Sequence, residues 1–175
     1  SAGSAGGYAD GYGKSSQDVL IASFMAAYTG QDANKISLNR FPKVPIPNWR
    51  LSYNGLTKYS FFNEIFTSID INHAYRSLYS VNGFNSLVRY QESNGAVNVK
   101  DASGNFLPFY QFSQITLFEQ FLPLFGVDVR LKNNMTLNLE YRKSRALSFS
   151  LSNSQLAQQK EDGAVFGLGY RTTKF

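Results

Sequence analysis

The stretch from Met135 to Ser152, MTLNLEYRKSRALSFSLS, decides the fold class because its polarity alternates with a period of two. Successive side chains of a β-strand point to opposite faces of the sheet, so this alternation predicts a strand with one apolar and one polar face. Only Lys143 and Arg145 interrupt the apolar, odd-numbered face. Residues 65–81 repeat the pattern, and residues 162–171 show it over a shorter length.

The length of these strands separates a membrane barrel from a soluble sandwich. Two of them run for about 17 residues, whereas soluble strands usually have about 3 to 10 and a tilted membrane crossing needs about 9 to 11. Aromatic residues reach 15% of the chain, and charged residues are 17%, below the roughly 25% of soluble domains. We therefore predict an all-β fold, in which antiparallel transmembrane strands form part of a very large outer-membrane β-barrel.

The connections also follow the pattern of outer-membrane barrels. Asn82-Gly83 and Lys132-Asn133-Asn134 have the chemistry of tight turns, and the polar segment 92–114 predicts a long loop on the outer surface. Pro123 predicts a bulge or kink. Since the smallest membrane barrels need about eight strands, the rest of the wall must come from identical copies or from a longer chain. The predicted strands number six and cover residues 48–54, 65–81, 84–91, 115–131, 135–152 and 162–171.

The N-terminal part has a different composition. We predict that residues 1–46 comprise a Gly-rich arm, a short helix at about 17–29 and a Pro-rich lead-in, and that residues 47–175 form the six-stranded barrel segment. Ser15-Ser16-Gln17-Asp18 begins the helix and Gly30 ends it.

The candidate chemistry is sparse. The chain has no cysteine and a net charge of +5 that is scattered along it, so neither thiolate metal sites nor a nucleic-acid surface is indicated. Gly13-Lys14-Ser15 lacks the preceding glycine and strand of a phosphate-binding loop. His73 is the single histidine and lies on the apolar face, where packing is its usual role. We predict no catalytic residue, no cofactor and no metal.

The alternation assigns side chains to two environments, a hydrated lumen and lipid. Charges of both signs on a lumen wall more commonly pair with each other and hold water than perform acid–base catalysis. The lumen-facing residues are predicted to be Asp70, Arg76, Glu140 and Arg142, and the lipid-facing residues Ile69, Ile71, Tyr75, Leu137, Leu139 and Phe149.

Several runs of sequence resemble, in the same order, the C-terminal region of the SprA (Sov) family of Bacteroidetes cell-surface proteins. They span nearly the whole chain and are long and idiosyncratic. The runs are Ser4–Tyr12, Ser16–Ile21, Ala27–Gly30, Pro45–Arg50, Asn72–Ser77, Gly126–Asp128, Leu131–Thr136, Leu139–Arg145 and Gly167–Arg171.

This resemblance implies a function that periodicity cannot give. Members of the family are very large barrels that form the outer-membrane translocon of the type IX secretion system, pass folded secreted cargo to the cell surface and support gliding motility. Their partners include a periplasmic plug protein and a PorV-type shuttle protein. Family members continue beyond the position of Phe175, so we expect this chain to be a fragment that joins the remainder of the same barrel in outer-membrane lipid.

Two other classes of protein remain as alternatives. A soluble β-sandwich adhesin or binding module of the cell surface would also show alternating strands. An outer-membrane hydrolase would need a serine, a histidine and an acid that converge on His73.

Overall fold

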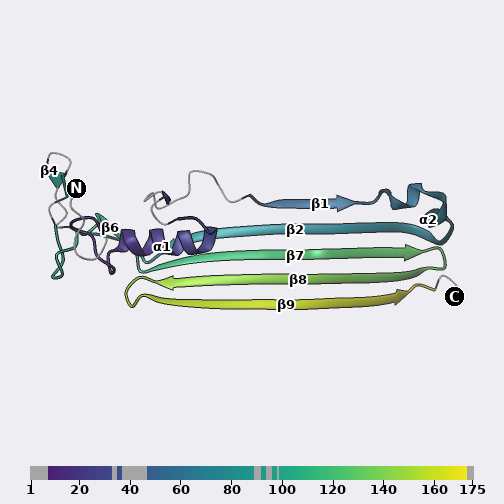
Figure 1. Ribbon diagram of the computed structural model, residues 1–175. Coiled ribbons are helices and arrows are strands. Elements are labelled where there is room, and N and C mark those ends of the chain that lie inside the picture. Colours follow the sequence, from purple (N-terminus) through teal and green to yellow (C-terminus); the bar gives the residue numbers. More distant parts are fainter. Residues whose placement is uncertain are drawn as a thin grey trace. The chain divides into compact units, whose positions relative to one another are not determined.

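The computed structural model describes residues 8–32, 35–36, 47–88, 92–93, 96–97 and 99–172 (Figure 1). Three parts of the sequence prediction lie outside the described residues. They are residues 1–7 of the Gly-rich arm, the Pro-rich lead-in before Pro47 and the terminal Phe175. The chain divides into two compact units. The first unit comprises Ser1–Pro45, Tyr79–Thr116 and Ser148–Ala157, and the second comprises Ile46–Leu78, Leu117–Leu147 and Gln158–Phe175.

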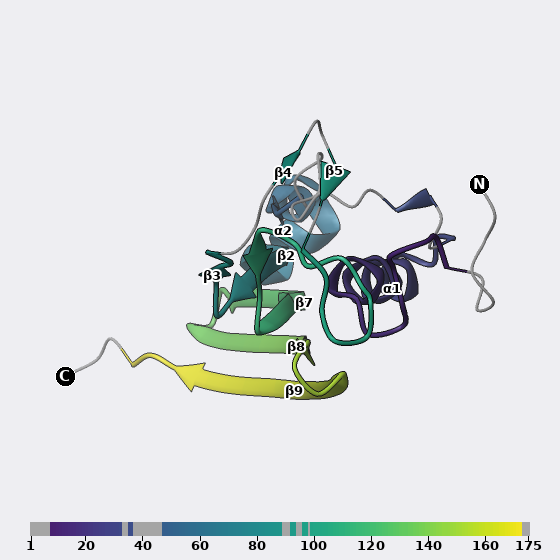
Figure 2. The ribbon, with the colours of Figure 1, turned by 90° about the vertical axis from the view of Figure 1, so that its left-hand side faces the viewer.

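One antiparallel sheet of five strands dominates the structure, and the all-β class is confirmed. Its strands are adjacent in the order β1-β2-β7-β8-β9, and four of them have 16 to 18 residues. Figures 1 and 2 show β7, β8 and β9 side by side. The strands are β1 (Trp49–Tyr53), β2 (Phe66–Asn82), β7 (Gln114–Leu131), β8 (Met135–Ser150) and β9 (Gln155–Tyr170).

The remaining elements are short. Helix α1 coincides with the helix predicted from the sequence, and Gly30 ends it in the left-handed region with φ 69°, which glycine adopts without steric cost. Within the described residues, none of the helices has the length and apolar character needed to cross a bilayer. The elements are α1 (Gln17–Thr29), the 3₁₀ turn η2 (Gly55–Lys58), α2 (Ser60–Ile65), β3 (Asn85–Ser86), β4 (Glu92–Ser93), β5 (Ala96–Val97) and β6 (Tyr110–Gln111).

The predicted strand at 84–91 is wrong. Within its described part, residues 84–88, Asn85–Ser86 alone forms a strand, β3, which pairs with β6 in a separate two-stranded sheet. The chain therefore leaves the main sheet at Gly83, whose φ is 67°, and returns to it at β7. The predicted tight turn at Asn82-Gly83 is therefore wrong, because this dipeptide opens the long connection of residues 83–113 between the neighbouring strands β2 and β7.

The tight turn at Lys132-Asn133-Asn134 is confirmed, and Asn134 adopts φ 64° as such turns require. The connection from β8 to β9 is also tight, although the strands predicted at 135–152 and 162–171 leave a connection of residues 153–161 between them. The observed turn occupies residues 151–154, with Ser154 at φ 55°. Strand β9 consequently begins at Gln155, well before the predicted start at residue 162.

Helix α1 packs against strand residues of the first unit through an aromatic stack. The rings of Phe24 and Phe149 are parallel, with centroids 5.6 Å apart, and both side chains are buried. Gln17 anchors the start of the helix, since its amide donates to the Tyr110 carbonyl at 3.0 Å and accepts from the Phe112 amide at 2.7 Å. The first unit thus has a small core of its own around α1.

A compact turn at Asp101–Asn105 lies in the same unit. The side-chain amide and the backbone amide of Asn105 both donate to the Asp101 carboxylate, at 3.0 and 2.9 Å. These hydrogen bonds favour the charged form, with the side-chain bond first, and they lower the pKa of Asp101 below its usual value.

Candidate functional site: the two faces of the sheet

Strand pairing in the second unit places even-numbered and odd-numbered residues on opposite faces of the sheet. In the antiparallel register of β1 and β2, Arg50 lies opposite Ala74 and Ser52 opposite Asn72. Directly opposed residues share a face, so these even-numbered positions lie together. We call this surface the polar face.

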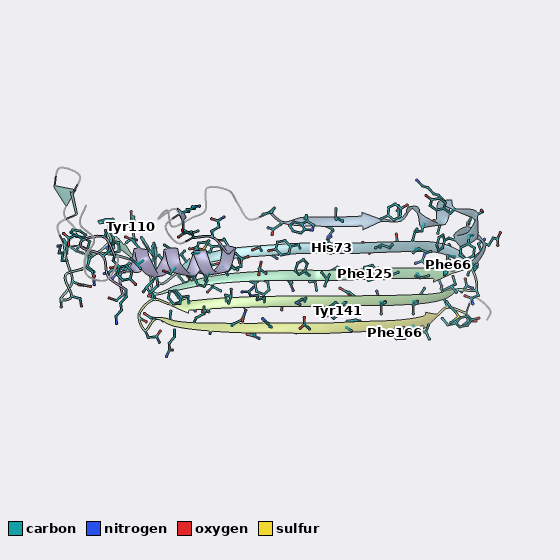
Figure 3. All side chains as sticks on the ribbon, viewed as in Figure 1. Phe66, His73, Tyr110, Phe125, Tyr141 and Phe166 are labelled. Atoms are coloured by element: carbon teal, nitrogen blue, oxygen red, sulfur yellow. The ribbon has the colours of Figure 1, made fainter. Side chains whose placement is uncertain are left out.

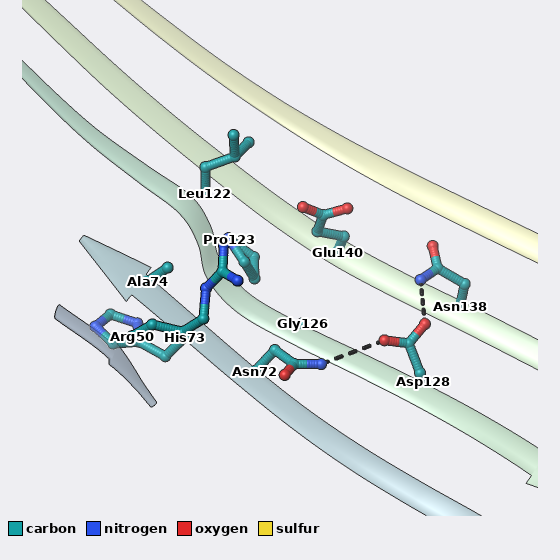
Figure 4. A pocket seen from close by; sticks show the side chains of 10 residues that line it. All are labelled: Arg50, Asn72, His73, Ala74, Leu122, Pro123, Gly126, Asp128, Asn138 and Glu140. Atoms are coloured by element: carbon teal, nitrogen blue, oxygen red, sulfur yellow. Dashed lines mark hydrogen bonds between the residues drawn. The ribbon is translucent and has the colours of Figure 1, made fainter. Parts of the chain in front are cut away.

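A chain of hydrogen bonds runs across the polar face and links four strands. Figure 4 shows the part of this chain that joins Asn72, Asp128 and Asn138. The Ser52 hydroxyl donates to Asn72 at 3.0 Å, and the Asn72 amide donates to the Asp128 carboxylate at 3.3 Å. Asn138 donates to the other carboxylate oxygen of Asp128 at 2.6 Å. Asp128 therefore bridges β2 and β8 from its position on β7, and it fixes the relative phase of the three strands.

Two half-open hollows lie on the polar face. One has a volume of about 240 Å³ and is lined by Arg50, Asn72, Asp128 and Glu140 among others (Figure 4). The other has a volume of about 410 Å³, and Asp70 and Asp128 lie on its wall. Polar and charged groups of both signs are prominent in the walls of these two hollows, so this part of the surface suits water.

Glycine leaves the end of β9 nearest the turn at residues 132–134 without side chains on the polar face, at Gly167 and Gly169. A Cβ atom built on Gly169 would lie 2.5 Å from the Thr136 hydroxyl oxygen, and one built on Gly167 would lie 3.4 Å from the Asn138 Cβ atom. Odd-numbered residues of β9 thus face the same way as even-numbered residues of β8. The alternation in residues 162–171 agrees with this assignment, since the leucine and the aromatic residues there are even-numbered and the glycines are odd-numbered.

Glu140 and Arg142 form the best-defined ion pair of the polar face. The guanidinium donates twice to the carboxylate, at 2.9 and 2.8 Å, and this two-bond geometry is the specific way in which arginine binds a carboxylate. The Arg142 side chain is nearly half exposed. Both residues therefore present charge to a wet surface without leaving either charge isolated.

The opposite face carries a group of exposed apolar side chains, which we call the apolar belt. Figure 3 shows side chains along the whole length of the long strands, with Tyr141 and Phe166 labelled. Leu168 is 65% exposed, although burial is the usual state of leucine. The apolar belt comprises Leu51 and Tyr53 of β1, Leu139 and Tyr141 of β8, and Phe166, Leu168 and Tyr170 of β9.

Charged residues share this face at one level of the strands. Tyr75 donates its hydroxyl to Glu119 at 2.8 Å, and Glu119 lies 4.0 Å from the Arg145 guanidinium. Lys143 and Asp162 also lie 4.0 Å apart. We call Glu119, Lys143, Arg145 and Asp162 the charged band. Lys143 and Arg145, which interrupt the alternation in the sequence, thus face carboxylates on the neighbouring strands.

His73 has a packing role in the structure. Its Nδ1 atom lies 2.6 Å from the Leu124 carbonyl oxygen, and its ring lies 6.4 Å from Trp49 and 5.8 Å from Phe121 between ring centroids. Across the described ranges, His, Cys, Asp and Glu form no group of three that could hold a metal ion.

The four residues predicted to face a lumen all lie on the polar face. Asp70 lines the larger hollow, Arg76 lies beside Arg50 at another hollow, and Glu140 and Arg142 are ion-paired. The sequence did not single out Asp128, Asn72 or Asn138. Their even-numbered positions indicate that they lie on the polar face. The sequence alone does not give the register between the strands that brings these three side chains into contact.

The predicted lipid-facing residues divide into two groups. Leu137 and Leu139 remain on the side of the sheet that carries the apolar belt, and Leu139 is 45% exposed. Phe149 differs from the prediction, because Phe24 of α1 stacks on it and leaves it only 8% exposed. Ile69 is also buried. Ile71 and Tyr75 are partly exposed, and Tyr75 is hydrogen-bonded to Glu119 as described above.

Comparison with models of known protein families finds no match, and comparison with curated proteins finds no relative.

Proposed function

We propose that this chain forms part of the wall of a large outer-membrane β-barrel that conducts proteins. The observation that carries the proposal is a sheet in which four strands have 16 to 18 residues, with a polar face and an exposed apolar belt on the other face. In an outer-membrane barrel the lumen is polar and the outside is apolar, and strands alternate accordingly.

The free edges of the sheet support a wall that continues beyond these strands. Among the described residues, β1 and β9 are the outermost strands of the sheet. Unpaired backbone groups are not tolerated in lipid, and closure of the sheet is the solution that membrane strands adopt. The remainder of the same barrel would supply the strands that pair with β1 and β9.

The transport role rests on the resemblance to the SprA (Sov) family. We infer a passive conduit for folded secreted proteins in type IX secretion, and through it a contribution to gliding motility. A plug protein and a PorV-type shuttle protein would gate it at the cell surface. Asp70, Arg76, Glu140 and Arg142 would keep the lumen wall hydrated, so that cargo meets water and paired charges without a strong binding site.

Fractionation of cells that produce the native polypeptide tests the membrane part of the proposal. We expect the polypeptide in the outer-membrane fraction after an alkaline wash, with a mass on a denaturing gel far above the 19.6 kDa of this chain. A monomer of about this mass that stays in buffer without detergent would instead support the adhesin alternative.

Site-specific photo-crosslinking tests the transport part. A photoreactive amino acid at Glu140 should crosslink to secreted cargo during export, whereas the same probe at Leu139 should crosslink to lipid. The two positions are neighbours in β8 and point to opposite faces, so each controls for the other. Cargo adducts at Leu139 with none at Glu140 would contradict the proposed lumen.

A further inference from the structure

The apolar belt ends sharply along the strands. On β8 the odd-numbered residues from Met135 to Tyr141 are apolar, and the next two are Lys143 and Arg145. On β9 the even-numbered residues from Tyr170 back to Ala164 are apolar, and the next is Asp162. The ion pair of Lys143 with Asp162 puts the two boundaries at the same level of neighbouring strands.

The same level is charged on a third strand. The Glu119 carboxylate of β7 lies 4.0 Å from the Arg145 guanidinium. The same carboxylate accepts a hydrogen bond from the hydroxyl of Tyr75 on β2. The charged band therefore crosses neighbouring strands as one line. Its side chains are from 19% to 52% exposed, so the charges lie at the surface of the sheet and are not part of a closed core.

We propose that the charged band marks the lipid headgroup level on one side of the bilayer, and that the apolar belt between this band and the turn at residues 132–134 contacts acyl chains. This inference rests on the proposed function, because it assumes that the sheet is embedded in an outer membrane. It assigns the membrane to one part of each long strand.

The distance from the turn to the band fits a bilayer. From Met135 to Lys143 the strand has about nine residues, and a tilted membrane strand needs about 9 to 11. Strand β8 continues for several residues beyond the band, to Ser150. Those residues would project beyond the headgroups.

The composition of the apolar belt favours lipid over a protein partner. It carries no formal charge, and Tyr141, Tyr53 and Tyr170 add the aromatic groups that are enriched where a barrel meets the bilayer surface. Lysine and arginine at the band can extend their charged groups toward lipid phosphates while their carbon stems remain on the apolar surface.

Two leucines on β9 provide a matched test. Leu168 and Leu156 both occupy even-numbered positions and are 65% and 59% exposed, but they lie on opposite sides of Asp162 along the strand. The chain has no cysteine of its own, so Leu168→Cys, Leu156→Cys and Lys143→Cys each introduce one labelling site into it. Thr136→Cys on the polar face is the control for water access.

Each variant is made in the full native polypeptide, in which any cysteine outside this chain is replaced by serine. It is labelled with bimane and reconstituted into phosphatidylcholine vesicles that carry a nitroxide quencher either in the acyl chain or at the headgroup. We expect Leu168→Cys to lose most of its fluorescence with the acyl-chain quencher, and Lys143→Cys to lose more with the headgroup quencher. Leu156→Cys and Thr136→Cys should lose little with either.

The outcomes separate this inference from the proposed function. Equal acyl-chain quenching at Leu168→Cys and Leu156→Cys would overturn the boundary and leave the membrane barrel intact. The boundary would also be overturned by acyl-chain quenching at Lys143→Cys as strong as at Leu168→Cys. Absence of quenching by lipid at every position would overturn both, and would leave a protein partner as the occupant of the apolar belt.

Discussion

Large apolar side chains differ in exposure between the two compact units. In the first unit Phe149 is buried, because Phe24 of α1 stacks on it. In the second unit Leu139 and Leu168 remain 45% and 65% exposed, and the described part of that unit provides no comparable cover. The chain covers apolar surface where it would meet water and leaves it uncovered where we propose that lipid provides the cover.

The largest expected effect comes from removing the ring of α1 that covers Phe149. Phe24→Ala should destabilise the contact of α1 with its strands by about 3 to 5 kcal/mol, the usual cost of removing a buried phenyl ring. Hydrogen exchange of the α1 backbone amides measures the loss as reduced protection. Ser23→Ala changes an exposed residue of the same helix and should alter stability by no more than about 0.5 kcal/mol. Equal protection in the two variants would show that the aromatic stack does not hold α1.

The uncovered side is tested by placing a charge in the apolar belt. Leu139→Arg should destabilise the inserted barrel by about 2 to 4 kcal/mol, because arginine near the bilayer midplane loses its hydration. Thr136→Arg is the control, since this exposed side chain lies on the polar face. Denaturant unfolding from phospholipid vesicles measures both. A larger loss for Thr136→Arg would reverse the assignment of the two faces.

A smaller effect is expected from filling the polar face of β9. Gly169→Val would bring a Cβ atom against the Thr136 hydroxyl, and overpacking of this kind costs about 1 to 3 kcal/mol. Gly163→Val is the matched change on the same strand, where no heavy atom lies within 4 Å of an added Cβ atom. The same unfolding assay should therefore separate the two valines. Similar losses would mean that glycine matters for strand flexibility and not for space.

The parts of the fold that the sequence predicts are those with a local cause. Alternation from Met135 onward gives β8, asparagine at Asn134 gives the turn, and Gly30 gives the end of α1. The start of β9 has no such cause. Leu156 and Ala157 are apolar but fall on opposite faces, and residues 158–161 are polar on both faces, so the start of this strand shows no alternation and depends on its place beside β8.

The candidate site divides in the same way. Alternation places Asp70, Arg76, Glu140 and Arg142 on one face, because facing depends on a residue's parity within its strand. It cannot give the link from Asn72 to Asp128, because this link requires the register between two strands that a long connection separates. The cover that α1 gives to Phe149 is likewise a tertiary contact. Alternation with a period of two shows which side chains share a face, but it does not show what packs against them.

The smallest expected effect comes from removing one charge of the charged band, which lies at the end of the apolar belt. Glu119→Gln keeps an oxygen that can accept the Tyr75 hydroxyl and removes the charge facing Arg145, so only the ionic part of the contact is lost. We expect a cost of about 0.2 to 1 kcal/mol, as for ion pairs near a surface, and a smaller cost at high salt. Asp162→Asn makes the same change in the pair with Lys143, whose two side chains are about half exposed, and it should cost less because water screens that pair more strongly. Unfolding from vesicles at low and high ionic strength measures both variants. A cost for Glu119→Gln that does not change with salt would mean that Glu119 acts through its hydrogen bond to Tyr75, and the charged band would then be ordered by that bond more than by charge.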